Sequence, residues 1–169
     1  MENRIVEAMN RQINAELWSA YMYLSMSLDA ESKGMKGVAN WMFVQWLEEQ
    51  DHARILQLFM LSVDAKVELM PIDGVPTSWE SVLEMFRGTL LHEIEVSSMI
   101  HQLMRMAVSV SDYATVSRLQ WFVDEQVEEE NSARDIVNML EMVEGDSTGL
   151  FKIDCMLYKR KYEKAAPLL

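Results

Sequence analysis

Residues 38–63 read VANWMFVQWLEEQDHARILQLFMLSV. Apolar side chains recur in this stretch at alternating spacings of three and four residues, which is the pattern of a helix face packed into a core. No Gly or Pro interrupts it, as the interior of a long helix requires. The face is polar only near its middle, and its members are Val38, Met42, Gln45, Glu49, His52, Leu56, Phe59 and Val63. The stretch predicts a core helix with a carboxylate and an imidazole at its centre.

Turn-forming residues divide the rest of the chain at 32–37, 65–78, 109–112 and 145–149. Four long segments lie between these breaks, each of about 30 residues and long enough for a helix of roughly 45 Å. The first and third breaks are short, which predicts two antiparallel helical hairpins. The second break holds two Pro and one Gly and is long enough to run back along a bundle.

The predicted fold is therefore an all-α four-helix bundle, with a long crossover between helices two and three and a short fifth C-terminal helix. We expect a single domain over 1–169, with the bundle in about 1–144 and the fifth helix over about 148–162. Local signals mark the helix ends. Thr77 and Glu80 have the spacing of a capping box for the third helix, and Ser111 or Asp112 can cap the fourth. Gly34 and Gly145 suit left-handed C-terminal caps.

Composition excludes several classes of protein. The 169 residues carry 27 acidic and 15 basic side chains, for a net charge of −12, which disfavours nucleic acid and anionic lipid as partners. No apolar run approaches the ~18 residues of a membrane span. The single Cys155 excludes a disulfide framework and a cysteine-only metal site. With the plain N-terminal residues 1–4, it predicts a reducing, cytoplasmic setting.

All four predicted helices have the same kind of stripe, apolar at both ends and acidic near the middle. The central carboxylates are Glu16, Glu49, Glu93 and Glu129, and His52 lies one turn beyond Glu49. Because antiparallel helices bring their middles to one level, the four Glu and one His should converge inside the bundle. The stripes of helices one, three and four are Ile5, Met9, Gln12, Glu16, Ser19, Tyr23 and Met26; Leu83, Phe86, Leu90, Glu93, Ser97, Ile100, Met104 and Ala107; and Thr115, Leu119, Phe122, Gln126, Glu129, Ala133, Ile136 and Leu140.

Buried carboxylates need compensation, because removing each charge from water costs several kcal/mol. No Lys or Arg occupies the four stripes. Two solutions remain open: the carboxyls share protons at raised pKa, or a metal ion supplies the positive charge. Four carboxylates and one imidazole suit hard or borderline cations that take oxygen and nitrogen ligands.

The convergence of the four stripes favours the metal interpretation, and the spacing of Glu49 and His52, a weak signal by itself, suits it. At i and i+3, both side chains project from one helix face and can bind one ion, while Glu49 can also bridge to a second. His92 and His101 have no Glu three residues earlier, and we expect them on the surface or on a helix flank. Cys155 is expected to be a small core or interface residue.

Longer motifs make the sequence similar to the ferritin family, and more narrowly to bacterial non-haem ferritins. The resemblance extends over almost the whole chain, the long crossover and the short fifth helix included, and it implies a ferritin-like bundle. The motifs are Asn14-Ala15-Glu16-Leu17 with Tyr21 and Tyr23, Glu48-Glu49-Gln50-Asp51-His52-Ala53, Leu91-His92-Glu93, and Gln120-Trp121-Phe122-Val123-Asp124-Glu125-Gln126-Val127-Glu128-Glu129.

The resemblance implies a di-iron centre within each chain. One iron would be bound by Glu16, Glu49 and His52. The second would be bound by Glu49, Glu93 and Glu129.

Further residues would surround this centre. Gln126 would lie beside it as a hydrogen-bonding group or weak ligand, and Tyr23 would lie next to the two irons. The family also has an accessory, third iron position, whose carboxylates map to Glu48, Glu125 and Glu128.

Other relatives fit less well. Bacterioferritins and rubrerythrins have a second Glu-x-x-His on the fourth helix, where this chain has Gln126-x-x-Glu129. Bacterioferritins place a haem-ligating Met directly after the helix-two Glu, and this position is Gln50, so no haem is expected. The small DNA-protecting ferritins lack the fifth helix and build their iron site between subunits.

The function that the resemblance implies is a ferroxidase that stores iron. Oxygen or hydrogen peroxide would take one electron from each of two Fe(II), and the ferric product would become a mineral inside a homo-oligomeric shell of 24 subunits. Two alternatives are a di-iron oxidase or peroxidase that stores no metal, and a structural bundle with protonated carboxyls. The residues expected to act in oxidation are Glu16, Glu49, His52, Glu93, Glu129 and Tyr23.

Overall fold

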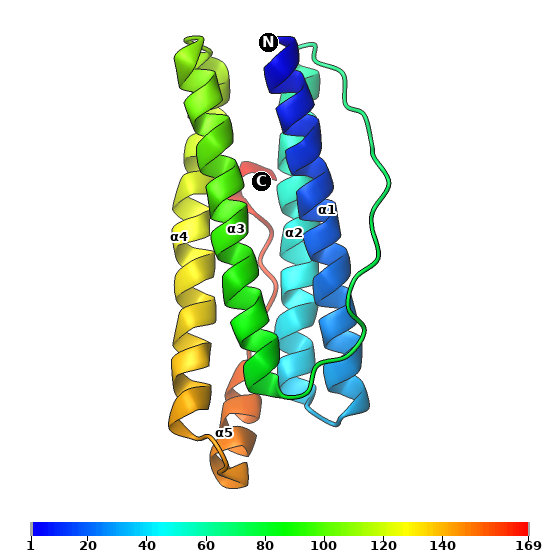
Figure 1. Cartoon of the computed structure of the whole chain (residues 1–169), viewed down its shortest axis with the longest axis vertical. Helices are drawn as coiled ribbons and strands as arrows, with labels where there is room; N and C mark the ends of the chain where they lie inside the picture. Colours follow the sequence, from blue (N-terminus) through cyan, green and yellow to red (C-terminus); the bar gives the residue numbers. More distant parts are fainter. Residues whose placement is uncertain (1, 169) are drawn as a thin grey trace.

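The computed structural model describes residues 2–168, and in that range the chain forms helices and no β-strand. Four long helices lie side by side, with a short helix at one end (Figure 1). This confirms the predicted all-α bundle with a fifth helix. The helices are α1 (Asn3–Ser32), α2 (Lys36–Ser62), α3 (Val82–Ser109), α4 (Tyr113–Met142), α5 (Ser147–Leu157) and the 3-10 turn η1 (Ala166–Leu168).

The connections have the predicted topology. α1 and α2 form one antiparallel hairpin, and α3 and α4 form the other (Figure 1). The crossover over 63–81 runs beside α1 from one end of the bundle to the other. The middles of all four helices are thereby brought to the same level.

The crossover is fastened to α1 by hydrogen bonds, although it has no regular structure. Asn10 is buried, donates from Nδ2 to the Lys66 carbonyl at 3.1 Å and accepts from the Glu68 N–H at 2.8 Å. Nearer the other end of the crossover, Ser25 Oγ donates to the Pro76 carbonyl at 2.6 Å. These bonds satisfy backbone groups that a helix or sheet would otherwise pair.

The third helix begins later than predicted, and the capping box of Thr77 and Glu80 is wrong. The N-cap is Ser81, whose Oγ accepts the N–H three residues further on at 3.0 Å. Trp79 explains the delay, because its N–H donates to the Asp29 carboxylate of α1 at 3.2 Å. This long-range bond holds the chain in the crossover until Ser81.

The predicted caps at the start of α4 and after α1 and α4 are confirmed. Asp112 caps α4 by accepting the Thr115 N–H at 3.1 Å. Gly34 and Gly145, which follow α1 and α4, have φ angles of +78° and +80°. Such left-handed conformations carry little steric cost for Gly.

The apolar core is divided into two clusters, with polar residues between them. One cluster contains Met26, Val38 and Met42, and the other contains Met9 and Leu56. The predicted stripes of α1, α2 and α4 are buried except for Val63 at the end of α2. α3 buries a neighbouring row as well, because Met85, Thr89, Val96 and Leu103 are buried while the predicted Leu83, Leu90 and Met104 are half-buried.

α5 is shorter than predicted, since it ends at Leu157 and not near residue 162. Asn40 of α2 helps to stop it, because its Nδ2 donates to the carbonyls of Leu157 at 3.3 Å and Arg160 at 3.0 Å. α5 also supplies a cap to α2. Asp154 Oδ1 accepts from the N–H groups of Gly37 at 2.8 Å and Val38 at 2.9 Å, where the helix terminus favours a negative charge.

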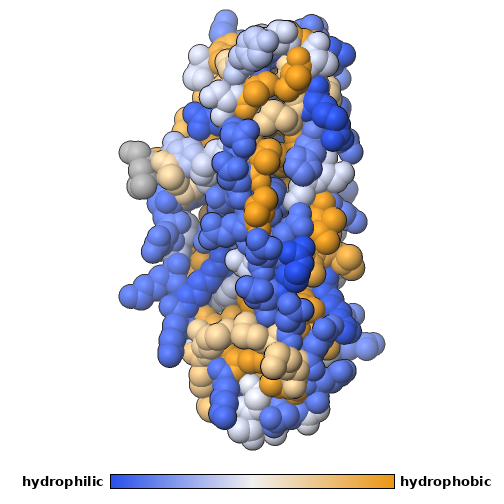
Figure 2. Space-filling model, turned by 90° about the vertical axis from the view of Figure 1, so that its left-hand side faces the viewer, coloured by the Kyte–Doolittle hydropathy of each residue, from blue (hydrophilic) through white to orange (hydrophobic). Residues whose placement is uncertain are grey.

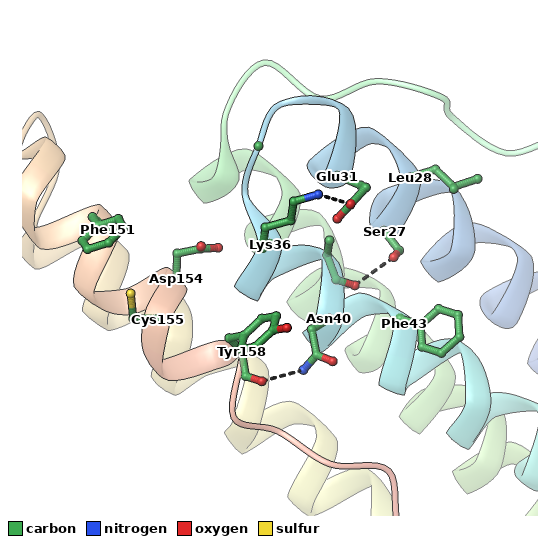
Figure 3. A pocket seen from close by; sticks show the side chains of 12 residues that line it. Ser27, Leu28, Glu31, Lys36, Asn40, Phe43, Phe151, Asp154, Cys155 and Tyr158 are labelled. Atoms are coloured by element: carbon green, nitrogen blue, oxygen red, sulfur yellow. Dashed lines mark hydrogen bonds and ion pairs between the residues drawn. The ribbon is translucent and has the colours of Figure 1, made fainter.

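A groove of about 850 Å³ lies where α5 meets the start of α2 (Figure 3). Leu28, Phe43 and Phe151 supply much of its apolar lining, and all three are exposed. Cys155 also lines the groove and is exposed, so its interpretation as a core residue is wrong. The alternative, that it lies in an interface, stays a prediction.

Among residues 2–168, no helix combines the length and the apolar character that crossing a membrane requires.

The contact of α5 with α2 predicts the effect of a single methyl group. A Cβ added at Gly37 would overlap the carbonyl of Asp154, whereas one added at Gly88 meets nothing within 4 Å. We expect Gly37→Ala to lower the free energy of unfolding by about 1–3 kcal/mol. Gly88→Ala should leave it unchanged or raise it by up to about 1 kcal/mol, because Ala is the better helix former. Urea unfolding at one protein concentration measures both, and equal values for the two variants would contradict the tight contact.

Candidate metal centre

Each long helix contributes a carboxylate to the polar layer between the two apolar clusters. Glu16 comes from α1, Glu49 from α2, Glu93 from α3 and Glu129 from α4, and none is more than 5% exposed. His52, one turn beyond Glu49 on α2, is 2% exposed. The structure therefore brings all the predicted central residues into the core at one level.

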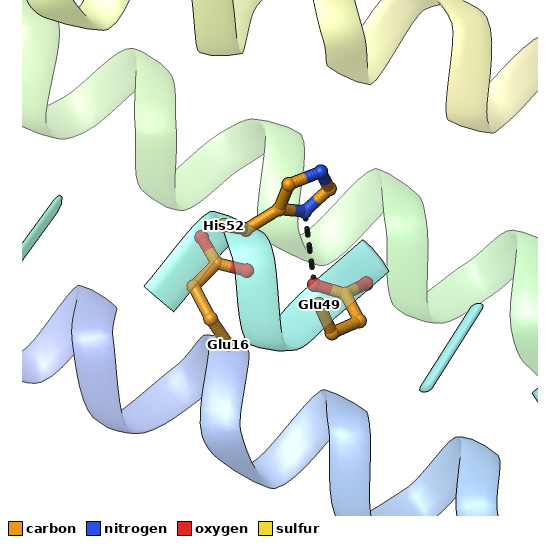
Figure 4. Close-up of side chains that lie close together, drawn as sticks. All are labelled: Glu16, Glu49 and His52. Atoms are coloured by element: carbon orange, nitrogen blue, oxygen red, sulfur yellow. Dashed lines mark hydrogen bonds and ion pairs between the residues drawn. The ribbon is translucent and has the colours of Figure 1, made fainter. Parts of the chain in front are cut away.

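The first tight group consists of Glu16, Glu49 and His52. One ligand atom from each lies within 4.8 Å of the other two. Figure 4 shows Glu16 reaching from α1 toward the pair on α2, where His52 Nδ1 lies 3.1 Å from Glu49 Oε2. These are the three residues predicted to bind one ion.

A second group forms on the other edge of the same imidazole. It contains His52, Glu125 and Glu129, again within 4.8 Å, and His52 Nε2 lies 3.8 Å from Glu125 Oε1. Glu125 was predicted for the accessory position, yet here it adjoins the central imidazole. In residues 2–168 these two are the groups of three that meet this distance, so the predicted set of Glu49, Glu93 and Glu129 stays a prediction.

Neutral hydrogen-bond donors hold the buried carboxylates in place. Gln126 Nε2 donates to Glu93 at 3.1 Å, and the Tyr23 hydroxyl donates to the other oxygen of Glu93. Gln45 Nε2 donates to Glu129 at 2.9 Å. Gln126 and Tyr23 thus both bind one of the central carboxylates, and their roles beside a metal ion stay a prediction.

Gln12 and Gln45 were not predicted as donors, although both belong to the predicted stripes. Gln12 lies one helical turn before Glu16 and donates to it at 2.9 Å. Gln45 has the same spacing to Glu49 but bonds across the bundle to Glu129. A Gln four residues before a central Glu was the signal in both cases. Gln45 Oε1 is buried and finds no hydrogen-bond partner among the described residues, so a polar atom is left free beside the carboxylates.

Burial favours the protonated form of three of the central carboxyls. Loss of hydration, with repulsion from Glu129, raises the pKa of Glu93 to about 8. Burial is also the main cause that raises the pKa of Glu49 and of Glu129. Burial alone would lower the pKa of His52, but the neighbouring carboxylates Glu125 and Glu49 raise it overall. A metal ion would supply the positive charge that these groups lack.

The predicted accessory residues differ in burial and in their partners. Glu128 is exposed, whereas Glu48 is half-buried and pairs with Arg160 at 2.6 Å. Burial raises the pKa of Glu48 to about 7, while Arg160 acts in the opposite direction. Sequence reasoning missed Arg160, because nothing in the local pattern indicates where a residue beyond the last helix will lie.

The surroundings of the centre include two aromatic contacts. Trp121 lies edge-on to His52, with ring centroids 5.6 Å apart. His92, expected on the surface or a helix flank, is half-buried beside Trp18, and its Nε2 lies 2.7 Å from Ser19 Oγ. Burial lowers the pKa of His92 to about 4, so this ring is neutral. His101 is exposed, as predicted.

The fold and the layer of carboxylates define a four-helix bundle whose core contains groups of residues that could hold a metal ion. The ferritin family model, described as a ferritin-like domain, matches residues 6–143. Bacterial non-heme ferritin of Bacteroides fragilis is 39% identical over 160 residues, covering 95% of this chain and 99% of the relative. The corresponding protein of Campylobacter jejuni is 32% identical, covering 91% and 92%.

Solved structures agree with the sequence relatives. An open pore ferritin from the hyperthermophilic archaeon Archaeoglobus fulgidus has a TM-score of 0.94 and 44% sequence identity, covering 95% of this chain and 99% of that one. The chain belongs to the ferritin family. The resemblance drawn from the sequence motifs is thereby confirmed.

The raised pKa of Glu93 predicts a pH dependence of stability without metal. In the unfolded chain this carboxyl loses its proton near 4.5, but in the folded chain only near 8. Its contribution to stability is therefore complete below 4.5 and is lost as the pH rises toward 8. Glu93→Gln should remove this part of the pH dependence. The free energy of unfolding of the variant should therefore rise relative to that of the unmutated protein as the pH rises, by up to about 1.4 kcal/mol for each unit by which the pKa is raised.

Urea unfolding with a chelator, at several pH values between 5 and 8, measures this difference. Glu95→Gln is the matched control, because Glu95 is an exposed carboxylate on the same helix. Its curve should stay parallel to that of the unmutated protein. A parallel curve for Glu93→Gln would contradict the prediction.

Proposed function

We propose that this protein stores iron after oxidising it at a di-iron ferroxidase centre inside each chain. The observation that carries the proposal is the buried group of Glu16, Glu49 and His52, whose ligand atoms lie within 4.8 Å of one another. Two carboxylate oxygens and one imidazole nitrogen are a suitable set for Fe(II). Membership of the ferritin family and relatives named bacterial non-heme ferritins support iron as the metal.

The ligand set favours the oxidised ion. Carboxylates stabilise Fe(III) more than Fe(II), because the higher charge gains more from anionic oxygen ligands. Glu49 bridges the two iron positions and keeps both ions within reach of one oxidant molecule. Each Fe(II) loses one electron, and the two electrons with two protons convert oxygen to hydrogen peroxide or hydrogen peroxide to two water molecules.

Protein groups hold the second position ready for its ion. Glu93 and Glu129 complete this position with Glu49, and Fe(II) displaces the protons that burial keeps on them. Tyr23 and Gln126 restrain Glu93, and Gln45 restrains Glu129, so the carboxylates need little rearrangement when the ion arrives. A shell of oxygen ligands with His52 as the one nitrogen ligand releases Fe(III) toward the store.

The storage part of the proposal requires an assembly around a hollow interior. We propose a shell of 24 subunits, each with a net charge of −12 that attracts cations. Figure 2 shows apolar side chains in a line and in a patch among hydrophilic ones on one face of the single chain. Contacts with neighbouring copies would cover exposed apolar side chains, and Leu28, Leu91 and Phe151 are 62%, 64% and 66% exposed.

The remaining parts of the proposal concern the setting. The protein works in the cytoplasm, with Fe(II) and oxygen or hydrogen peroxide as substrates and without haem. The single Cys and the net charge of −12 support this setting and disfavour nucleic acid or a membrane as partner.

The proposed storage of iron can be tested with the apo-protein. Apo-protein exposed in air to a large excess of Fe(II) should elute from a size-exclusion column as a particle far larger than a dimer, with iron absorbance in the same peak. Protein at a monomer or dimer position with precipitated iron would overturn storage and favour a di-iron oxidase. Absence of tight metal binding at neutral pH would favour a structural bundle with protonated carboxyls.

The proposed oxidation of Fe(II) can be tested with a variant that lacks one ligand. Glu49→Ala removes a ligand common to both iron positions and should slow the fast phase of Fe(II) oxidation by at least about tenfold. Stopped-flow absorbance at two Fe(II) per chain measures this phase. Glu95→Gln, which changes an exposed carboxylate, should keep the original rate. Unchanged fast oxidation in Glu49→Ala would refute the site.

A further inference from the structure

The segment after α5 turns back and lies along α2. Asn40 Nδ2 binds the Arg160 carbonyl at 3.0 Å, near the start of α2. Three turns further along the helix, Asp51 Oδ2 accepts from the Tyr162 hydroxyl at 2.7 Å and from the Ala165 N–H at 3.0 Å. In Figure 1 this segment rises from α5 toward the middle of the bundle. The contacts at both ends fix the position of the residues between them.

Arg160 is the residue that this arrangement places against the metal centre. Its Nη2 lies 2.6 Å from Glu48 Oε2, and its Nη1 donates to the Trp41 carbonyl at 3.4 Å. The guanidinium also lies over the Trp41 ring, 4.5 Å from the centroid. Its side chain is only 23% exposed. Three contacts from one helix therefore hold a positive charge in one place.

The partner of Arg160 belongs to the same cluster of charges as the centre. Glu48 directly precedes Glu49 in α2. The carboxyl of Glu48 interacts electrostatically with Glu129, His52 and Glu125. The positive charge of Arg160 in turn favours the ionised form of Glu129. The guanidinium thus stands at the edge of the carboxylate cluster, where the accessory ligands Glu48 and Glu125 were predicted to take a third ion.

We propose that the guanidinium of Arg160 occupies the accessory cation position through Glu48 and excludes a third metal ion from it. The guanidinium already pairs with Glu48 Oε2, and a metal ion bound by the same carboxylate would lie beside this fixed positive charge and be repelled by it. The exposed Glu128 offers no buried alternative. A metal ion would have to break the ion pair and the contact with Trp41 before it could bind.

This inference rests on the proposed di-metal centre, and it specifies how many metal ions each chain binds. Each chain with Arg160 in place binds two metal ions tightly, and removal of the guanidinium opens a third position. Arg160 is therefore a positioning residue that acts through Glu48 and not a catalytic one.

Calorimetric titration of the full-length apo-protein with Zn(II) measures the number of metal ions bound per chain and does not depend on the oxidation of Fe(II). We expect two tightly bound Zn(II) per chain for the unmutated protein and three for Arg160→Gln. The double variant Arg160→Gln with Glu48→Gln should return to two. Lys161→Gln, which removes the same charge from an exposed neighbour, should bind two.

Glu48→Gln alone provides a second test that leaves Arg160 unchanged. It should bind two Zn(II), because Glu48 holds no metal ion in the unmutated protein. Three Zn(II) in the unmutated protein, two in Arg160→Gln, or the loss of one ion in Glu48→Gln would each overturn the role of Arg160. Fewer than two in the unmutated protein would instead overturn the proposed di-metal centre, and this inference with it.

Discussion

The burial of several carboxylates at one level of a helical bundle is the constraint on which the rest of the structure depends. Two apolar clusters close this level off from the ends of the bundle, and burial raises the pKa of Glu49, Glu93 and Glu129. Neutral amides and a phenol bind the carboxylates, so the core keeps its shape while its charge is incomplete. A cation bound among these carboxylates would add to the stability of the folded chain.

The segments outside the bundle support this layer from a distance. The crossover is fastened to α1 through Asn10 and Ser25, and α5 caps the start of α2 through Asp154. Beyond α5, the chain returns along α2 and brings Arg160 to Glu48. The parts of the chain with the least regular structure therefore make long-range polar contacts that set the helix positions and the charge at the edge of the centre.

The helical parts of this arrangement were predictable, because the period of three and four residues and the placement of Gly and Pro are local properties. They located the hairpins, the crossover, the Asp112 cap and the buried positions of Glu16, Glu49, His52, Glu93 and Glu129. The start of α3 was mistaken because Asp29, 50 residues away, binds Trp79. Arg160 was missed for the same reason, since its partner lies 112 residues earlier. The grouping of Glu125 with His52 depends on side-chain rotamers, which spacing does not specify.

The position of His52 between two carboxylate groups has a consequence for how the molecule assembles. Glu16, Glu49 and His52 all belong to the α1–α2 hairpin, whose contacts are local in the chain, so this group includes no residue of the other hairpin. The other group joins His52 to Glu125 and Glu129 of α4, and it exists only when the two hairpins have docked. An ion bound on that side would link the two hairpins to each other.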